Sequence, residues 1–257
     1  MAEPDVASGK GGTPVRRRRD EARVDHQPGF VLHTTAWRET SLIVEGFTRD
    51  FGRMSLVARG AKRPTSQFRG LLSPFTPLSF SWSGRSEAKN LVRVEWVGGL
   101  APLRGGALLS AFYANELIVR LLARADPHER LFASYLDMLH GLGDARLDVA
   151  LRAFELDLLR EVGYAVPLDR CIDGEPIDPR ANYVFRVEAG AHRVSTHARD
   201  EHGSHVSGTT LLAMARGDFE DAAVASEAKA MLRHLIRYHL DGKPLNTRRI
   251  LLDLHQL

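Results

Sequence analysis

Five short runs of β-forming residues, separated by turn signals, lie between residues 29 and 100 of this 257-residue chain. Each run is rich in Val, Leu, Phe, Thr or Trp, which favour the half-buried surface of a sheet. Asp50-Phe51-Gly52 predicts a tight turn after the second run, and Ser83-Gly84-Arg85-Ser86 predicts one after the fourth. The connection after the third run is longer. The expected strands are 30–37, 41–48, 53–59, 75–83 and 89–97.

Five strands with a long third connection fit a small closed barrel of the oligonucleotide-binding (OB) type over residues 29–100. Periodicity alone leaves an SH3-like barrel open. Residues 64–72 separate the third and fourth strands, and a short helix or a loop would fit there.

After Pro102 the apolar residues recur with a helical period. Three consecutive amphipathic segments must bury their apolar stripes against one another, which predicts a helical domain over residues 101–257. Gly141 and Gly163 are expected to end the second and third of these helices. The fold class is therefore α+β, with two domains. The expected helices are 107–124, 127–141, 145–162, 208–216, 224–240 and 246–255.

Two segments do not follow either period. Residues 164–206 contain several prolines and histidines and one short β-like run, Tyr183 to Val187, and are expected to form an irregular insert in the helical domain. Residues 1–28 are rich in Gly, Pro and charge, which predicts a disordered basic tail. The run Arg16 to Arg19 can add nonspecific phosphate contacts, although a solvated tail is the favoured interpretation.

Charge is divided unevenly along the chain, whose net charge is +3. Residues 1–107 hold 17 Lys and Arg against 10 Asp and Glu, whereas residues 108–257 hold 18 against 22. A basic N-terminal half favours phosphate-bearing partners. No apolar run approaches the roughly 20 residues that cross a bilayer, and Cys171 is the single cysteine. We therefore expect a cytoplasmic, nucleoid-associated protein without membrane contact.

The sequence lacks a nucleophile elbow, a phosphate-binding Walker loop and a paired-carboxylate motif, so no enzyme activity and no cofactor are expected. The insert does gather potential zinc ligands, but the one pair at close spacing is His202 and His205. Solvated histidines are the favoured interpretation, and no metal site is expected. The residues concerned are Cys171, His192, His197, His202 and His205.

The candidate nucleic-acid contacts are the cationic positions of the barrel segment. A basic turn, Arg59 to Pro64, follows the third strand, and no carboxylate occurs from Phe51 to Gly84. Proteins that bind single strands combine a cationic groove with aromatic platforms. The candidate aromatics, each of which can instead fill the barrel core, are Phe51, Phe68, Trp82 and Trp96. The candidate basic residues are Arg49, Arg53, Arg59, Lys62, Arg63, Arg69, Lys89 and Arg93.

Several blocks in order resemble the RecO family of bacterial recombination mediators. The blocks are FVLHTTAWRETSLIVEGFTRDFGRMSLVARGAKR from Phe30, LLSPFTPL at 71–78, YANEL at 113–117, LRAFELDLLREVGY at 151–164 and GKPLNTRRILL at 242–252. The resemblance implies an OB domain followed by a helical domain. It also implies a non-enzymatic protein that binds single- and double-stranded DNA and anneals complementary strands.

The resemblance implies two protein partners as well. RecO-like proteins act with RecR to displace single-stranded DNA-binding protein, so that RecA loads on the DNA. They recruit single-stranded DNA-binding protein through its acidic, apolar C-terminal tail, and the candidate contacts on the third helix are Leu151, Arg152 and Leu156. Many members carry a four-cysteine zinc site in the insert. Here Cys171 stands at the first ligand position and the other three cysteines are missing, which predicts a metal-free remnant.

Two other functions stay open at this point. One is a general single-stranded nucleic-acid-binding OB protein whose helical half mediates dimerisation. The other is a zinc-dependent enzyme that uses the histidine-rich insert.

Overall fold

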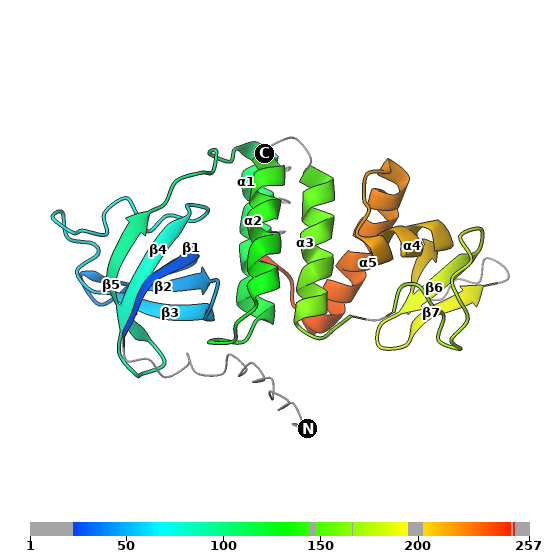
Figure 1. Cartoon of the computed structure of the whole chain (residues 1–257), viewed down its shortest axis with the longest axis horizontal. Coiled ribbons are helices and arrows are strands. Elements are labelled where there is room, and N and C mark those ends of the chain that lie inside the picture. The colour runs from blue at the N-terminus through cyan, green and yellow to red at the C-terminus, as the bar shows by residue number, and fades with distance from the viewer. Residues whose placement is uncertain (1–22, 144–146, 166, 195–202, 248, 250–257) are drawn as a thin grey trace, which may run out of the picture.

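A computed structural model describes residues 23–143, 147–165, 167–194, 203–247 and 249 of the chain. A barrel and a small sheet lie at opposite ends of the molecule, with the helices between them (Figure 1). The two-domain α+β architecture expected from the sequence is confirmed.

The N-terminal domain is a closed five-stranded barrel with strand order β1-β2-β3-β5-β4. All neighbours pair antiparallel except β3 and β5, which pair in parallel through Leu56 with Lys89 and Val57 with Asn90. This single parallel pair closes the barrel, so its strands have no free edge. The strands are β1 (Arg23–Trp37), β2 (Ser41–Thr48), β3 (Gly52–Ala58), β4 (Leu78–Ser83) and β5 (Lys89–Trp96).

The first strand begins earlier than expected. Residues 23–28, which composition assigned to a disordered tail, belong to β1 and pair with β4, from Arg23 opposite Ser83 to Pro28 opposite Ser79. Val24 and Gln27 are buried there, so pairing and burial outweigh the polar composition of this segment. Residues 1–22 lie outside the described part of the chain.

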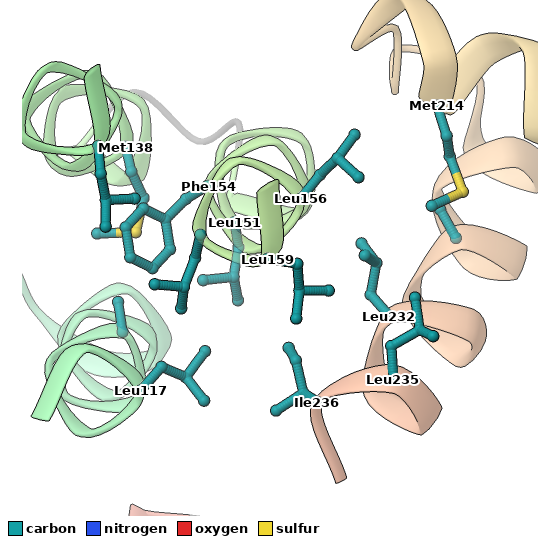
Figure 2. Close-up of a cluster of buried hydrophobic side chains, with 14 of the residues drawn as sticks. Leu117, Met138, Leu151, Phe154, Leu156, Leu159, Met214, Leu232, Leu235 and Ile236 are labelled. Carbon is teal, nitrogen blue, oxygen red and sulfur yellow. The ribbon is translucent and has the colours of Figure 1, made fainter. Parts of the chain in front are cut away.

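Three helices stand side by side next to the barrel, and two more follow after the insert (Figure 1). Their apolar faces meet in one core, in which Phe154 of the third helix points toward the second and Leu156 points the other way (Figure 2). Of the sixth expected helix, Asn246, Thr247 and Arg249 are helical and the rest is not described. The helices are α1 (Gly105–Leu121), α2 (Glu129–Gly143), α3 (Leu147–Glu161), α4 (Gly208–Arg216) and α5 (Ala222–His239).

Gly141 does not end α2, which continues to Gly143. A Cβ atom at Gly141 would lie 2.7 Å from Cβ of Ala150 in α3. The glycine therefore permits α2 and α3 to approach closely and does not end the helix. Its position in the sequence does not distinguish a glycine that ends a helix from one that packs between helices.

The insert is more regular than expected. It contains a three-stranded sheet of order β7-β6-β8, in which the short β-like run becomes the central strand. Tyr183 and Phe185 are buried in the core that the helices form, and Val184 between them is also buried. The flanking strands have little apolar periodicity, so only their pairing with β6 identifies them. The strands are β6 (Asn182–Arg186), β7 (Gly190–Val194) and β8 (Ser204–Ser207).

The barrel and the helices share a buried interface. Phe30 and Phe47 project from β1 and β2 into the helical core, where their ring centroids lie 5.1 to 5.9 Å from those of Phe132 and Tyr135 in α2. Aromatic pairs at such separations stabilise a packed interface beyond their burial alone. The two domains are therefore held together by a common apolar core.

The helices that the structure describes are all too short or too polar to cross a bilayer.

Candidate nucleic-acid interface

Three connections of the barrel meet around a polar depression of about 470 Å³. They are the β1–β2 turn, the segment that follows β3, and the β4–β5 loop. OB barrels bind oligonucleotides on the face of strands 2 and 3 and between these same β1–β2 and β4–β5 loops. We call the depression the barrel cradle. It is lined by Trp37, Arg38, Thr40, Ser41, Val57, Arg59, Gly60, Arg63, Ser86, Ala88 and Asn90.

Backbone hydrogen bonds fix the basic turn beside the β1–β2 turn. The Lys62 amide donates to the Thr40 carbonyl over 2.9 Å, and Lys62 Nζ reaches the Arg38 carbonyl at 3.5 Å. Within the basic turn, the Arg63 amide donates to the Gly60 carbonyl over 3.0 Å. Residues 59–63 therefore have a defined position relative to Arg38.

Cations of the barrel cradle are available to a ligand. Arg59 and Arg63 are exposed, and among the described residues neither of them forms an ion pair with a carboxylate. The Arg38 guanidinium lies 5.9 Å from the ring centroid of Trp37, whose side chain is 44% exposed. A cationic wall beside an exposed indole is the combination that holds a phosphate and stacks a base.

Trp37 is the aromatic that sequence reasoning missed. Three of the four candidates, Phe51, Phe68 and Trp82, are buried in the barrel core, and Phe51 packs edge-on against Trp82. Trp96 is 68% exposed but does not line the barrel cradle. Its place in the sequence could have identified it, because Trp37 immediately precedes the β1–β2 turn, and the loops at this end of an OB barrel bind oligonucleotides. None of the other four aromatics borders this turn.

Arg53 occupies a different environment from the other basic candidates. Its side chain is half-buried at the junction with the helices, 3.7 Å from Glu45, which also accepts from Arg124 over 2.5 Å. Burial lowers the pKa of Arg53, against the opposing effect of Glu45. Arg124 in turn reaches Glu87 in the β4–β5 loop at 3.0 Å. Arg53 therefore belongs to a network that ties the barrel to the α1–α2 connection.

The remaining basic candidates spread over the barrel. Arg49 pairs with Asp50 at 2.8 Å, and Arg93 pairs with Glu95 at the same distance. Arg69 donates to the Pro64 carbonyl at 3.1 Å, and Lys89 lies on β5 opposite Leu56. Of the eight basic candidates, the structure brings Arg59 and Arg63 into the barrel cradle and places Lys62 beside them.

A second depression, of about 500 Å³, lies between α1, α3, α5 and the segment after α5. Its walls are apolar, with Leu109, Leu147 and Ile236 among them, and its rim is basic. We call it the helical groove. Its basic side chains, of which all but Arg152 were missed from the sequence, are Arg152, Lys229, Arg233, Arg237 and Lys243.

The floor of the helical groove contains a buried ion pair. Arg152 and Glu155, whose side chains are 4% and 1% exposed, lie 3.0 Å apart, and the Tyr113 hydroxyl donates to Glu155 over 2.7 Å. Burial raises the pKa of Glu155, although Arg152 opposes this effect. Burial together with the nearby Glu155 carboxylate raises the pKa of Tyr113 well above its usual value. Arg152 is thus already paired, whereas the exposed Arg233 and Arg237 face the groove from α5.

The three candidate residues on α3 divide between two depressions. Leu151 and Arg152 line the helical groove, whereas Leu156 lines a smaller depression toward α4 and β6, in keeping with its direction in Figure 2. Both leucines are buried at 6% exposure.

The histidine-rich insert yields no cluster of three or more potential metal ligands among the residues that the structure describes. His197 and His202 lie outside those residues. Cys171 is half-buried, and burial with the nearby Asp173 raises its thiol pKa.

A closed five-stranded barrel of OB topology with a basic loop face places the chain in a class of folds that bind oligonucleotides and oligosaccharides. Two family models match it, "Recombination protein O N terminal" over residues 23–100 and "Recombination protein O C terminal" over residues 104–249. The first match begins at the first residue of β1.

Full-length relatives agree. The chain is 48% identical to DNA repair protein RecO of Ralstonia nicotianae over 258 aligned residues, which cover 100% of this chain and 94% of the relative. It is 50% identical to DNA repair protein RecO of Aromatoleum aromaticum, with 91% and 98% covered, and 46% identical to that of Nitrosospira multiformis, with 93% and 99% covered. The chain belongs to the RecO family, a family of non-enzymatic DNA repair and recombination proteins.

Proposed function

We propose that this protein is a recombination mediator that binds DNA through the barrel cradle and anneals complementary single strands. The exposed cations of the barrel cradle, set beside Trp37, carry the proposal. Annealing requires no covalent chemistry. Two polyanions must share a cationic surface while their bases remain free to pair, and each neutralised phosphate releases counterions.

The cradle favours single strands on geometric grounds. The floor is formed by barrel residues such as Val57 and Asn90, and the exposed indole of Trp37 gives one base a stacking surface. Base stacking on an aromatic side chain contributes about 1–3 kcal/mol and tolerates any sequence. Double-stranded DNA offers the same phosphates without free bases, so it should bind through the cations alone.

The helical groove is the proposed site for the C-terminal tail of single-stranded DNA-binding protein. That tail is acidic and apolar, which complements a groove with apolar walls and exposed cations at its rim. Leu151 and Arg152 would form its floor, with Arg233 and Arg237 as the carboxylate contacts. With both sites in one molecule, the protein would act with RecR to load RecA on coated strands in the cytoplasm.

An annealing assay on coated strands tests the proposal. Complementary oligonucleotides are mixed with and without bound single-stranded DNA-binding protein, and duplex formation is followed by fluorescence. We expect annealing in both cases. Annealing of naked strands only would favour the alternative, a general nucleic-acid-binding OB protein, and no annealing at all would overturn the proposal.

A charge-reversal variant locates the surface. Arg59→Glu, Lys62→Glu and Arg63→Glu together should weaken DNA binding and flatten its salt dependence, because three phosphate contacts are lost. The matched control reverses Arg23, Arg49 and Arg93, each of which already pairs with a carboxylate on the same barrel. Equal losses in the two variants would show that overall charge, rather than the barrel cradle, determines affinity.

A further inference from the structure

The β4–β5 loop brings an acidic residue to the edge of the barrel cradle. Ser86 and Ala88 line the cradle, and Glu87 lies between them in the chain with a side chain that is 76% exposed. Like charges repel, so an unpaired carboxylate here would oppose the binding of a phosphate backbone. Direct contact with DNA therefore does not explain a glutamate at this position.

Glu87 is paired with a cation from the helical domain. Arg124, which follows α1, donates to Glu87 over 3.0 Å through one terminal nitrogen and to Glu45 over 2.5 Å through the other. The Glu45 side chain is only 10% exposed. The backbone beside Arg124 is fixed as well, because the Ala125 amide donates to the Arg53 carbonyl of β3 over 2.8 Å. Arg124 is therefore a fixed point to which the loop is attached.

The contact with Arg124 acts on the middle of the loop. Strand pairing sets the two ends, where Ser83 lies opposite Asn90. The Ser86 hydroxyl donates to the Ala88 carbonyl over 2.7 Å, which links the two neighbours of Glu87 to each other. Among the side-chain hydrogen bonds of the described residues, the bond from Arg124 to Glu87 then joins this turn to another element. It therefore fixes the two cradle-lining residues on either side of Glu87.

The effect of this contact should appear in DNA affinity rather than in folding stability. Surface loops are mobile unless they are tied down, and ordering a loop when a ligand binds costs entropy. A contact that orders the loop beforehand removes part of that cost. An ion pair as exposed as that of Glu87, by contrast, contributes little to the stability of the fold.

We propose that Glu87 is a positioning residue for DNA, and that with Arg124 it holds the β4–β5 loop in the shape that lines the barrel cradle. This inference rests on the proposed DNA-binding function of the cradle and deepens it. An acidic residue then strengthens the binding of a polyanion. The helical domain contributes to the DNA site through Arg124 without touching the strand.

The test is the affinity of Glu87→Ala, in the full chain, for a fluorescent oligothymidine. Exposed ion pairs change an equilibrium constant by up to about fivefold, so the variant should bind about two- to fivefold more weakly than the parent. The slope of affinity against salt should stay that of the parent, because no phosphate contact is lost. If Glu87 only repels phosphates, or if the released Arg124 binds one, affinity will rise instead, and the inference is overturned.

Two further variants separate the hydrogen bond from the charge. Glu87→Gln removes the same charge but keeps an acceptor for Arg124, so it should bind more tightly than Glu87→Ala. Glu95→Ala removes a carboxylate that pairs with Arg93 at 2.8 Å on the same barrel but outside the cradle, and it should not weaken binding. Equal affinities of the two Glu87 variants, or an equal loss in Glu95→Ala, would count against positioning through Arg124.

A double-mutant cycle tests whether Glu87 acts through Arg124. Arg124→Gln should weaken binding, and adding Glu87→Ala should weaken it no further, whereas independent roles would give additive losses. Because Arg124 also binds buried Glu45, the melting temperature of each variant is measured first. If Arg124→Gln does not fold, the comparison of Glu87→Ala with Glu87→Gln decides the inference.

A cradle variant, Arg59→Gln, Lys62→Gln and Arg63→Gln, separates failure of the inference from failure of the proposed function. If the cradle variant binds weakly while Glu87→Ala binds as tightly as the parent, the inference is overturned and the proposed function stands. If the cradle variant binds like the parent, or the parent itself does not bind the oligonucleotide, both are overturned.

Discussion

Tyr135 of α2 donates a hydrogen bond of 2.6 Å to the side-chain oxygen of Asn115 in α1, and both residues are buried. The side-chain amide nitrogen of Asn115 donates in turn to the Leu32 carbonyl of β1 over 2.9 Å. Burial raises the pKa of Tyr135, which keeps its hydroxyl protonated as the donor. One asparagine therefore connects two helices and a barrel strand through paired hydrogen bonds inside the apolar core that the two domains share.

Asn115→Ala should destabilise the protein by about 2–4 kcal/mol, because it leaves the Leu32 carbonyl and the Tyr135 hydroxyl buried without partners. Tyr135→Phe should cost about 1–2 kcal/mol. The measurement is urea denaturation followed by circular dichroism. Tyr238→Phe is the control, because the hydroxyl of half-exposed Tyr238 bonds to exposed Glu188, and its loss should change stability much less than either of these substitutions. Equal losses at positions 135 and 238 would contradict the role assigned to Asn115.

Trp37→Ala should weaken binding of single-stranded DNA by about 1–3 kcal/mol, or roughly 5- to 150-fold, through loss of a stacking surface. The exposed Trp96, which lies outside the barrel cradle, provides the matched control, and Trp96→Ala should leave affinity nearly unchanged. Fluorescence anisotropy at fixed salt measures both. The stacking role is wrong if Trp96 proves to be the more important tryptophan.

Arg233→Ala combined with Arg237→Ala should weaken binding of an acidic C-terminal tail peptide at least tenfold, because two exposed cations leave the rim of the helical groove. Arg152 is avoided in this test, since removing one partner of its buried pair with Glu155 costs about 3–5 kcal/mol of stability. Titration calorimetry gives the affinity. DNA binding by the same variant should match the parent, and joint loss of both activities would place the peptide and DNA on one surface.

Glu116 makes stability sensitive to acid. Burial alone would raise its pKa, but hydrogen bonds from the Thr247 and Asn246 amides and from the Thr247 hydroxyl outweigh it, and the pKa of Glu116 lies below its ordinary value. A lowered folded-state pKa contributes stability that is present above the unfolded-state pKa, about 4.3, and is lost as pH falls through the folded-state value.

Glu116→Gln should therefore lower stability by about 1–2 kcal/mol at pH 7 and by progressively less as the pH falls below about 4. Denaturation curves at several pH values test this, with Glu188→Gln at an exposed hydrogen bond as the control. A loss at pH 7 that persists unchanged at pH 3 would exclude the charge of Glu116 as its source.

Gly52→Ala should disrupt the junction between the barrel and the α1–α2 connection. Gly52 has φ of +67°, and an added Cβ would lie 1.7 Å from the carbonyl oxygen of Asp126. Gly70 has a similar φ of +76° with nothing within 4 Å of its Cβ position. Gly70→Ala should cost about 1–2 kcal/mol from backbone strain alone, and Gly52→Ala should cost clearly more. Similar melting temperatures for the two variants would contradict a rigid junction.

The elements of the fold that depend on local sequence pattern could be predicted from the sequence. Alternating β-formers and turn residues located β2, β3, β4 and β5 to within a few residues, but only the later part of β1. Helical periodicity located α1, α2 and α3, because neighbours in sequence create these patterns. The outer strands of the insert, β7 and β8, could not be predicted from the sequence. Their pairing with β6 identifies them, because their own residues show no clear strand periodicity. The basic turn from Arg59 to Arg63 was found from composition alone.

The sequence by itself determined the class of fold, the family and the basic character of the barrel, because each depends on local pattern or on blocks of residues in order. Tertiary structure alone decided which side chains can meet a ligand. It buried Trp82 and paired Arg53 with Glu45, while it left Trp37 exposed beside Arg38. It also brought the start of β1 within two strand spacings of the barrel cradle. These contacts join residues that lie far apart in the sequence and form only when the barrel closes. The periodicity of residues along the chain therefore does not predict them.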